Sequence, residues 1–190
     1  MWTGRIALLA LGLLTGGGWF DRVLKKGTKR ALLLLVPLVF GLTYVPTLYE
    51  TSVRLCFAPC AFFLAAALLC PSDEPLSAAA AAALAGLLGE KLSDAFPLFP
   101  EQGLLTALPA LALSFCFARS TGARALAIAA APFCMLLFRA AGDAALFSFA
   151  VLELGSGDAL AAETVGILLL LIFEAVFARL PARGRVTART

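Results

Sequence analysis

The chain has 190 residues, of which 62% are hydrophobic and 14% are charged, and its mean hydropathy is +0.96. A typical globular domain is about 45–50% apolar and about 25% charged, so this composition excludes an ordinary water-soluble domain. The absence of histidine excludes an imidazole base, a histidine metal ligand and a histidine-bound haem. We therefore expect one all-helical membrane domain over residues 1–190, embedded in a lipid bilayer.

Apolar segments along the chain predict a polytopic bundle of transmembrane helices with about seven spans. A spanning helix needs about 20 mostly apolar residues. Several segments are shorter than this, so they need semi-polar flanking residues or a locally thin bilayer. The predicted spans are residues 2–20, 31–49, 55–70, 76–89, 104–118, 125–138 and 159–178.

The sixth span has two alternative placements. With a span at 125–138, Arg139 and Asp143 lie in an external loop, whereas a span at 131–152 places them near the membrane midplane. They are four residues apart, so on one helix they would be neighbours able to pair. We favour the loop because a buried charge pair is costly unless it is well satisfied. A six-span chain with residues 144–154 lying on the membrane is the remaining alternative.

The basic residues predict the orientation in the membrane. Alternation across seven spans places eleven of them on one side and four on the other, and basic residues concentrate on the cytoplasmic side. We expect an external N-terminus and a cytoplasmic C-terminus. The abundance of arginine and alanine indicates a high-GC bacterial gene, and hence the bacterial cytoplasmic membrane. The inside set is Arg22, Lys25, Lys26, Lys29, Arg30, Arg119, Arg124, Arg179, Arg183, Arg185 and Arg189, and the outside set is Arg5, Arg54, Lys91 and Arg139.

Motifs typical of enzymes are missing from the sequence. It contains no Gly-x-Ser-x-Gly elbow, no phosphate loop and no dinucleotide fingerprint, and among the aspartates only Asp143 is a candidate for a place inside a span. The odd number of cysteines argues against a complete disulfide framework and favours thiols that pack as small hydrophobes. We expect no catalytic residue, no metal, no cofactor and no nucleic-acid partner. The cysteines are Cys56, Cys60, Cys70, Cys116 and Cys134.

Small residues in two segments predict close helix contacts. Lipid offers no hydrophobic force between helices, so contact depends on packing, and small residues let two backbones approach. Leu84, Leu87 and Leu88 fall on the opposite side of the fourth segment. The small face favours packing within the chain's own bundle, or else docking of a membrane protein partner or a second copy. Its members are Ala78, Ala79, Ala82, Ala85, Gly86 and Gly89, and the first segment adds Gly12 and Gly16.

Two glutamates in the last segment are the main polar candidates. Glu163 and Glu174 are eleven residues apart, so on a helix they share one face about 16 Å apart. Carboxylates on a buried face are what a proton or cation route needs, whereas a glutamate bound to an arginine or a backbone group is the structural alternative. Arg179 lies about 140° around the helix from Glu174, so we expect Glu174 either to be a neutral acid or to have a partner from another helix.

The layout as a whole resembles that of known small membrane proteins. Seven short spans, Trp19 closing the first, the basic loop of residues 25–30 and the Phe-Pro-rich segment around Phe96 are similar to the YphA-type membrane proteins of spore-forming bacteria. That resemblance implies no particular reaction. By size, the chain also resembles the substrate-binding membrane components of vitamin transporters, whose small-residue faces dock a transport subunit.

Two functions are compatible with these features. The first is a non-enzymatic multi-pass membrane component that assembles with partner proteins through its small-residue faces. The alternative is a small-solute or ion transporter, or a substrate-binding transport subunit, that uses Glu174 together with Arg139 or Asp143.

Overall fold

The computed structural model describes residues 2–45, 47–49, 53–69, 73–99, 102–147 and 151–179. Within these ranges the chain forms seven helices and three very short strands, which confirms the predicted all-helical class. The helices are α1 (Trp2–Gly16), α2 (Lys26–Leu42), α3 (Phe57–Leu69), α4 (Pro75–Ala95), α5 (Gln102–Phe117), α6 (Thr121–Phe147) and α7 (Gly157–Phe177). The strands are β1 (Leu48–Tyr49), β2 (Val53–Leu55) and β3 (Leu152–Leu154).

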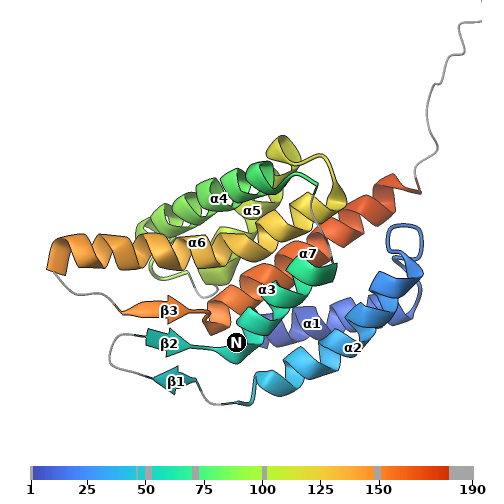
Figure 1. Cartoon of the computed structure of the whole chain (residues 1–190), viewed down its shortest axis with the longest axis horizontal. Coiled ribbons are helices and arrows are strands. Elements are labelled where there is room, and N and C mark those ends of the chain that lie inside the picture. Colours follow the sequence, from blue (N-terminus) through green and yellow to red (C-terminus); the bar gives the residue numbers. More distant parts are fainter. Residues whose placement is uncertain are drawn as a thin grey trace, which may run out of the picture.

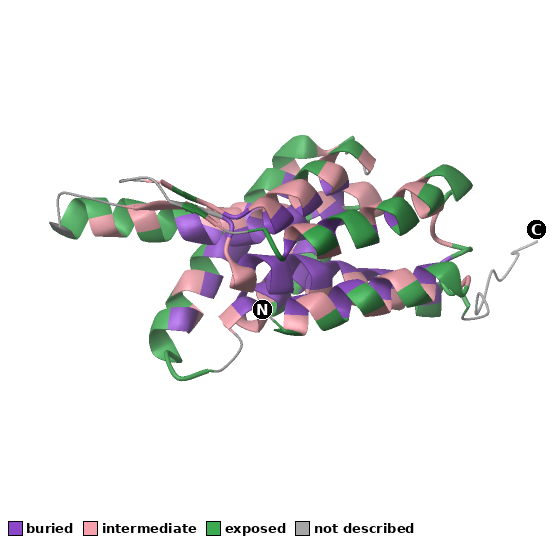
Figure 2. Cartoon of the chain, turned by 90° about the horizontal axis from the view of Figure 1, so that it is seen from below, coloured by how far each residue is buried: buried purple, intermediate pink, exposed green. Residues whose placement is uncertain are grey.

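Helix α7 forms the centre of the bundle. It packs against α1, α3, α5 and α6, while α4 covers α5 and α6 and α2 bridges α1 and α3 (Figure 1). The buried residues run along this centre, and the outer helix faces are exposed (Figure 2). The N-terminus of α7 is well specified, because the Ser156 hydroxyl accepts the backbone N–H of Ala159 at 3.1 Å and Asp158 lies in the first turn.

The outer surface of the bundle carries many large apolar side chains. Leu13, Leu34, Leu68 and Leu76 are among the most exposed. Single exposed leucines are ordinary in a soluble protein, but apolar side chains spread over the outside of every outer helix suit contact with hydrocarbon.

Three helices are long and apolar enough to cross a membrane, by length and composition. They are Pro75–Ala95, Thr121–Leu146 and Gly157–Phe177. Helices α1, α3 and α5 are apolar but shorter. The structure is therefore compatible with a membrane location, and helix length alone does not assign a crossing to each of the seven predicted spans.

The second and sixth predicted spans need correction. Helix α2 ends at Leu42 and the chain then forms strand β1, so residues 43–49 do not continue the helix predicted to run to residue 49. Helix α6 runs on to Phe147, so the external loop predicted for Arg139 and Asp143 is wrong. Residues 139–147 are rich in alanine, the strongest helix former, and the single Gly142 costs only about 1 kcal/mol. Within the described residues, Arg139 and Asp143 form no ion pair with each other.

Connections that are distant in sequence meet at the two ends of the bundle. At one end β2 pairs antiparallel with β1 and parallel with β3, which joins the α2–α3 and α6–α7 connections. At the other end the backbone N–H of Arg119 donates to Glu74 at 3.2 Å, which joins the α3–α4 and α5–α6 connections. The helices therefore run alternately up and down, as Figure 1 shows. We call these the strand end and the opposite end.

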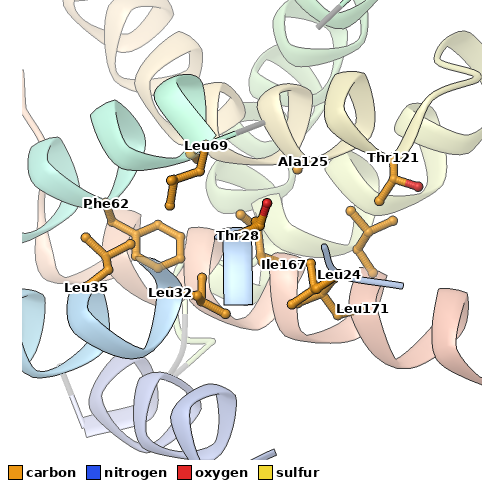
Figure 3. Close-up of a pocket in the computed structure, with 12 residues that line it drawn as sticks. Leu24, Thr28, Leu32, Leu35, Phe62, Leu69, Thr121, Ala125, Ile167 and Leu171 are labelled. Carbon is orange, nitrogen blue, oxygen red and sulfur yellow. The ribbon is translucent and has the colours of Figure 1, made fainter. Parts of the chain in front are cut away.

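An apolar cavity of about 50 Å³ lies between α2, α3, α6 and α7. Leu32, Phe62 and Leu171 point into it (Figure 3). Most of its lining residues are aliphatic or aromatic, so it lacks the several polar partners that a buried water needs. The buried polar side chains of α7 lie outside this cavity.

Candidate functional site

Glu163 is the most unusual side chain in the described part of the bundle. It lies in the first half of α7 with an exposed fraction of 0%, and neither carboxylate oxygen has a hydrogen-bond partner among the described residues. Its neighbour Thr164 is equally buried, but the Thr164 hydroxyl donates to the carbonyl of Leu160 at 2.7 Å. A buried polar group normally finds such a partner, so Glu163 is an exception that calls for a reason.

Two other helices pack closely against the first turns of α7. A Cβ on Gly4 of α1 would lie 3.1 Å from the backbone nitrogen of Ala161, so α1 has no room for a side chain there. A Cβ on Gly103 of α5 would likewise collide with the Asp158 carbonyl. These two glycines let α1 and α5 close around this part of α7, where every residue from Ala159 to Thr164 is buried.

Two thiols lie near the Glu163 carboxylate. Cys56, just before α3, and Cys60, in its first turns, are close enough to interact with it electrostatically. The loop before α7 lies directly on this region, because a Cβ on Gly155 would be 2.5 Å from Pro59. Gly155 has a φ of +81°, in the left-handed region that favours glycine. Glu163 thus lies beneath the start of α3, toward the strand end.

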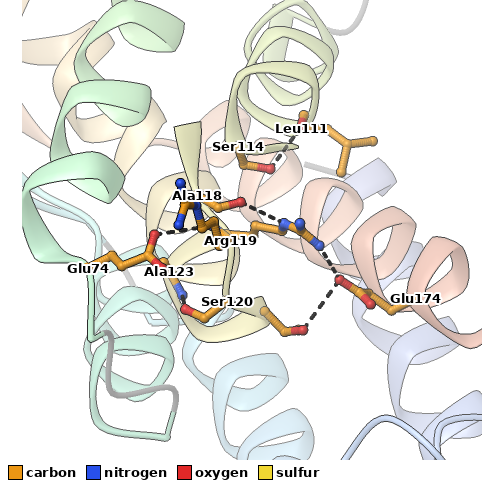
Figure 4. A network of polar contacts seen from close by, with 10 residues as sticks. Glu74, Leu111, Ser114, Ala118, Arg119, Ser120, Ala123 and Glu174 are labelled. Atoms are coloured by element: carbon orange, nitrogen blue, oxygen red, sulfur yellow. Dashed lines mark hydrogen bonds and ion pairs between the residues drawn. The ribbon is translucent and has the colours of Figure 1, made fainter. Parts of the chain in front are cut away.

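Glu174 has a different environment near the other end of α7. One of its oxygens accepts from Arg124 Nη1 at 2.6 Å and from the Thr121 hydroxyl at 3.3 Å (Figure 4). The side chains of Arg124 and Glu174 are only 18% and 22% exposed. Arg124 also donates to the Ala118 carbonyl at 3.0 Å and lies over the ring of Phe115 at 4.4 Å.

The expected origin of the Glu174 partner is confirmed. The arginine comes from α6, while Arg179, just after the end of α7, lies over the Trp19 ring at 4.4 Å. Glu163 and Glu174 share a helix but not an environment, because one is buried without a partner and the other is held in an ion pair. The structure does not bring them together.

Arg139 and Asp143 do not join either glutamate. Arg139 is exposed and lines a polar pocket of about 280 Å³ at the strand end, together with Glu153 and Asp158. Asp143 is half-buried one turn further along α6, in the part of that helix that projects beyond the bundle (Figure 1).

The small-residue face of α4 packs inside the bundle. A Cβ on Gly86 would lie 2.7 Å from both Cys134 Cβ and the backbone nitrogen of Met135, and one on Gly89 would lie 2.6 Å from the Thr106 hydroxyl. The face therefore contacts α6 and α5 of the same chain. Ala78, Ala82 and Ala85 are buried as expected, Ala81 joins them, Ala79 is exposed, and Leu84, Leu87 and Leu88 are exposed on the far side.

The first helix uses its glycines in the same way. A Cβ on Gly12 would lie 3.0 Å from a Val36 methyl group, and one on Gly16 would lie 3.8 Å from a Leu33 methyl group, both in α2. In the single chain, the glycines of both small faces therefore contact neighbouring helices of the same bundle.

Sequence reasoning missed the ion pair at the strand end. Arg54 of β2 and Glu153 of β3 are register partners, and their side chains are 3.0 Å apart. The two strands have three residues each and are separated by about a hundred positions, so no local pattern could have indicated that they pair.

The described residues contain no group of three or more histidine, cysteine, aspartate or glutamate side chains that could hold a metal ion. Comparison with protein-family models, with curated proteins and with solved structures finds no match to this chain. The resemblance in layout to YphA-type membrane proteins therefore stays a prediction.

Proposed function

We propose that the chain is a multi-pass integral membrane protein that carries protons, and that Glu163 is the group that takes up the proton inside the bundle. The observation that carries this proposal is the Glu163 carboxylate, which is fully buried and has no hydrogen-bond partner among the described residues.

The arrangement of the helices and charges supports the multi-pass part of the proposal. The helices alternate in direction, and their outer faces are apolar. Basic side chains predominate at the opposite end, where α7 ends, which suits a cytoplasmic side for the end of α7 and an external side for the start of α1. The basic residues at the opposite end are Arg22, Lys25, Lys26, Lys29, Arg30, Arg119, Arg124 and Arg179, those at the strand end are Arg5, Arg54, Lys91 and Arg139, and acidic residues lie at both ends.

The surroundings of Glu163 favour a proton over other cations. Metal cations such as Ca²⁺ or Mg²⁺ need several oxygen ligands, whereas the groups that interact electrostatically with this carboxylate include the thiols of Cys56 and Cys60. A proton needs no cavity and no further ligand. Intramembrane carboxylates of this kind mark proton relays, because the group is costly while charged and loses that cost when it binds a proton.

The features that suggested partner docking or a Glu174 route give less support. The small faces of α1 and α4 are filled by the chain's own helices, and Glu174 already has a cationic partner in Arg124. A proton-carrying group must be able to bind and release a proton. Glu163 can do so without breaking an ion pair, whereas Glu174 is paired with Arg124.

Proton flux into vesicles tests the proposal. Purified protein is reconstituted into liposomes that contain a pH-sensitive dye, and a pH step is applied outside. Wild type should acidify the interior faster than protein-free vesicles, and Glu163→Gln should abolish that difference, because the amide keeps the shape but does not titrate. Thr164→Val, an isosteric change at the next buried position, controls for altered packing of α7. Equal flux from wild type and Glu163→Gln at equal amounts of folded protein would contradict the proposal.

A further inference from the structure

A pocket of about 190 Å³ opens at the strand end of the bundle. Arg54, Cys56, Glu153 and Ser156 are among its lining residues. It adjoins the pocket of about 280 Å³ that Arg139 lines, because Glu153 and Ser156 border both. The two pockets form a polar recess where β2, β3 and the start of α7 meet.

Cys56 connects this recess to Glu163. The residue lines the smaller pocket, and its thiol interacts electrostatically with the Glu163 carboxylate. Gly157, the first residue of α7, also lines the pocket, and Glu163 lies six residues further on, about 9 Å along the helix axis. The recess therefore approaches the buried carboxylate from the strand end.

Few other ionisable groups face Glu163. Cys60 of α3 is the second thiol that interacts with it. Helix α5 carries no aspartate, glutamate, lysine or arginine. Arg5 of α1 donates instead to Thr43, through Nε to the hydroxyl and Nη2 to the carbonyl, both at 3.1 Å. The charged groups of α6 near this end, Arg139 and Asp143, lie at the recess or beyond it.

The recess has features suited to water and a cover that can open. The Ser93 hydroxyl is buried without a hydrogen-bond partner among the described residues, and Ser93 lines the larger pocket, where a water could satisfy it. The Arg54–Glu153 ion pair lies at the border of the recess, with side chains 50% and 34% exposed. Exposed ion pairs contribute little to stability, so loss of this contact alone costs little.

We propose that this recess is the entrance through which protons from the external solution reach Glu163, and that the Arg54–Glu153 ion pair covers it. In this step a proton moves from water in the recess to a carboxylate oxygen of Glu163, and no other bond changes. The inference rests on the proposed function, since it gives the proton acceptor its access route and its side of the membrane.

Accessibility of the Cys56 thiol tests the entrance separately from proton transport. Full-length variants that keep one cysteine, either Cys56 or Cys134, are placed in oriented vesicles and exposed to a membrane-impermeant, positively charged thiol reagent from each side. Cys134 is the matched control because it is half-buried in α6 and lines neither pocket. We expect external reagent to label Cys56 and not Cys134, and Glu153→Gln in the Cys56 variant to speed that labelling several-fold.

The outcomes separate the two proposals. Labelling of Cys56 from the cytoplasmic side only, equal labelling of both thiols, or no labelling of Cys56 even with Glu153→Gln would overturn the entrance. Labelling of Cys56 as expected, in a protein whose Glu163→Gln variant keeps wild-type proton flux, would support the recess as a water-filled entrance and overturn Glu163 as the proton acceptor.

Discussion

Glu163 and Glu174 lie on the same helix, yet their removal should have opposite effects on stability. The Glu174 carboxylate neutralises a guanidinium group that is itself partly buried, so the pair stabilises the contact between α6 and α7. The Glu163 carboxylate makes no such contact within the described residues. Its burial therefore lowers the free energy of unfolding, and no hydrogen bond offsets this loss.

Glu174→Gln should destabilise the folded bundle. The change leaves Arg124 without its counter-charge, and loss of a charged hydrogen bond in a partly buried pair costs about 1–3 kcal/mol. Unfolding in mild detergent, followed by circular dichroism, measures the loss. Arg124→Gln should cost a similar amount, and the double variant should cost little more than either single one. Strictly additive losses would show that the two residues are not coupled.

Glu163→Leu should leave the stability unchanged or raise it. Replacement of buried ionic groups by apolar side chains of similar volume is often neutral or stabilising, by about 1–4 kcal/mol. The same unfolding measurement applies, with Thr164→Val as the neighbouring control. A clear loss of stability in Glu163→Leu would reveal a structural bond to this carboxylate and would remove the reason for assigning it a transport role.

The sequence placed both glutamates on one helix, but it could not predict how differently the two carboxylates are buried and partnered. The long apolar run before Glu174 made that residue the stronger candidate, while Glu163 has alanines and a threonine beside it. The burial of Glu163 depends on packing by helices that are distant in the chain and meet α7 only in the folded bundle. A cationic partner for Glu174 from another helix could be expected. The sequence did not indicate that this partner would be Arg124.

At the scale of single helices, the small face of α4 was predictable because it depends only on helical periodicity. Residues three and four apart share a face, and small residues on that face indicate close contact. The helix ends were less predictable. The chain after Leu42 leaves the helix to form β1, and the β2–β3 pairing that completes this sheet joins segments far apart in the sequence.

Gly86→Leu and Ala82→Leu should disrupt the bundle, whereas Leu84→Ala should be mild. A side chain at position 86 would meet the backbone nitrogen of Met135, which cannot move aside, and overpacking of this kind typically costs about 1–3 kcal/mol or more. Leu84 is exposed on the outer face. The yield of monodisperse protein in detergent compares the three variants. Similar losses in all three would show that the face is wrongly assigned.

At the scale of the whole molecule, the alternating helices and the uneven charge at the two ends support a definite orientation. A reporter fused after Thr190 should behave as cytoplasmic, and a tag placed before Met1 should be reached from outside intact cells, because basic residues are retained on the cytoplasmic side. If both termini report the same side, the seven-span arrangement is wrong.

The proposed function depends most directly on protonation of Glu163 inside the folded protein. Infrared difference spectroscopy of the protein in lipid, recorded as the pH is changed, detects the carbonyl stretch of a protonated carboxylic acid. We predict a band from a buried acid in wild type that persists in Glu174→Gln and disappears in Glu163→Gln. Identical spectra from wild type and Glu163→Gln over the whole pH range would show that this carboxyl group does not exchange a proton, and would contradict the proposed function.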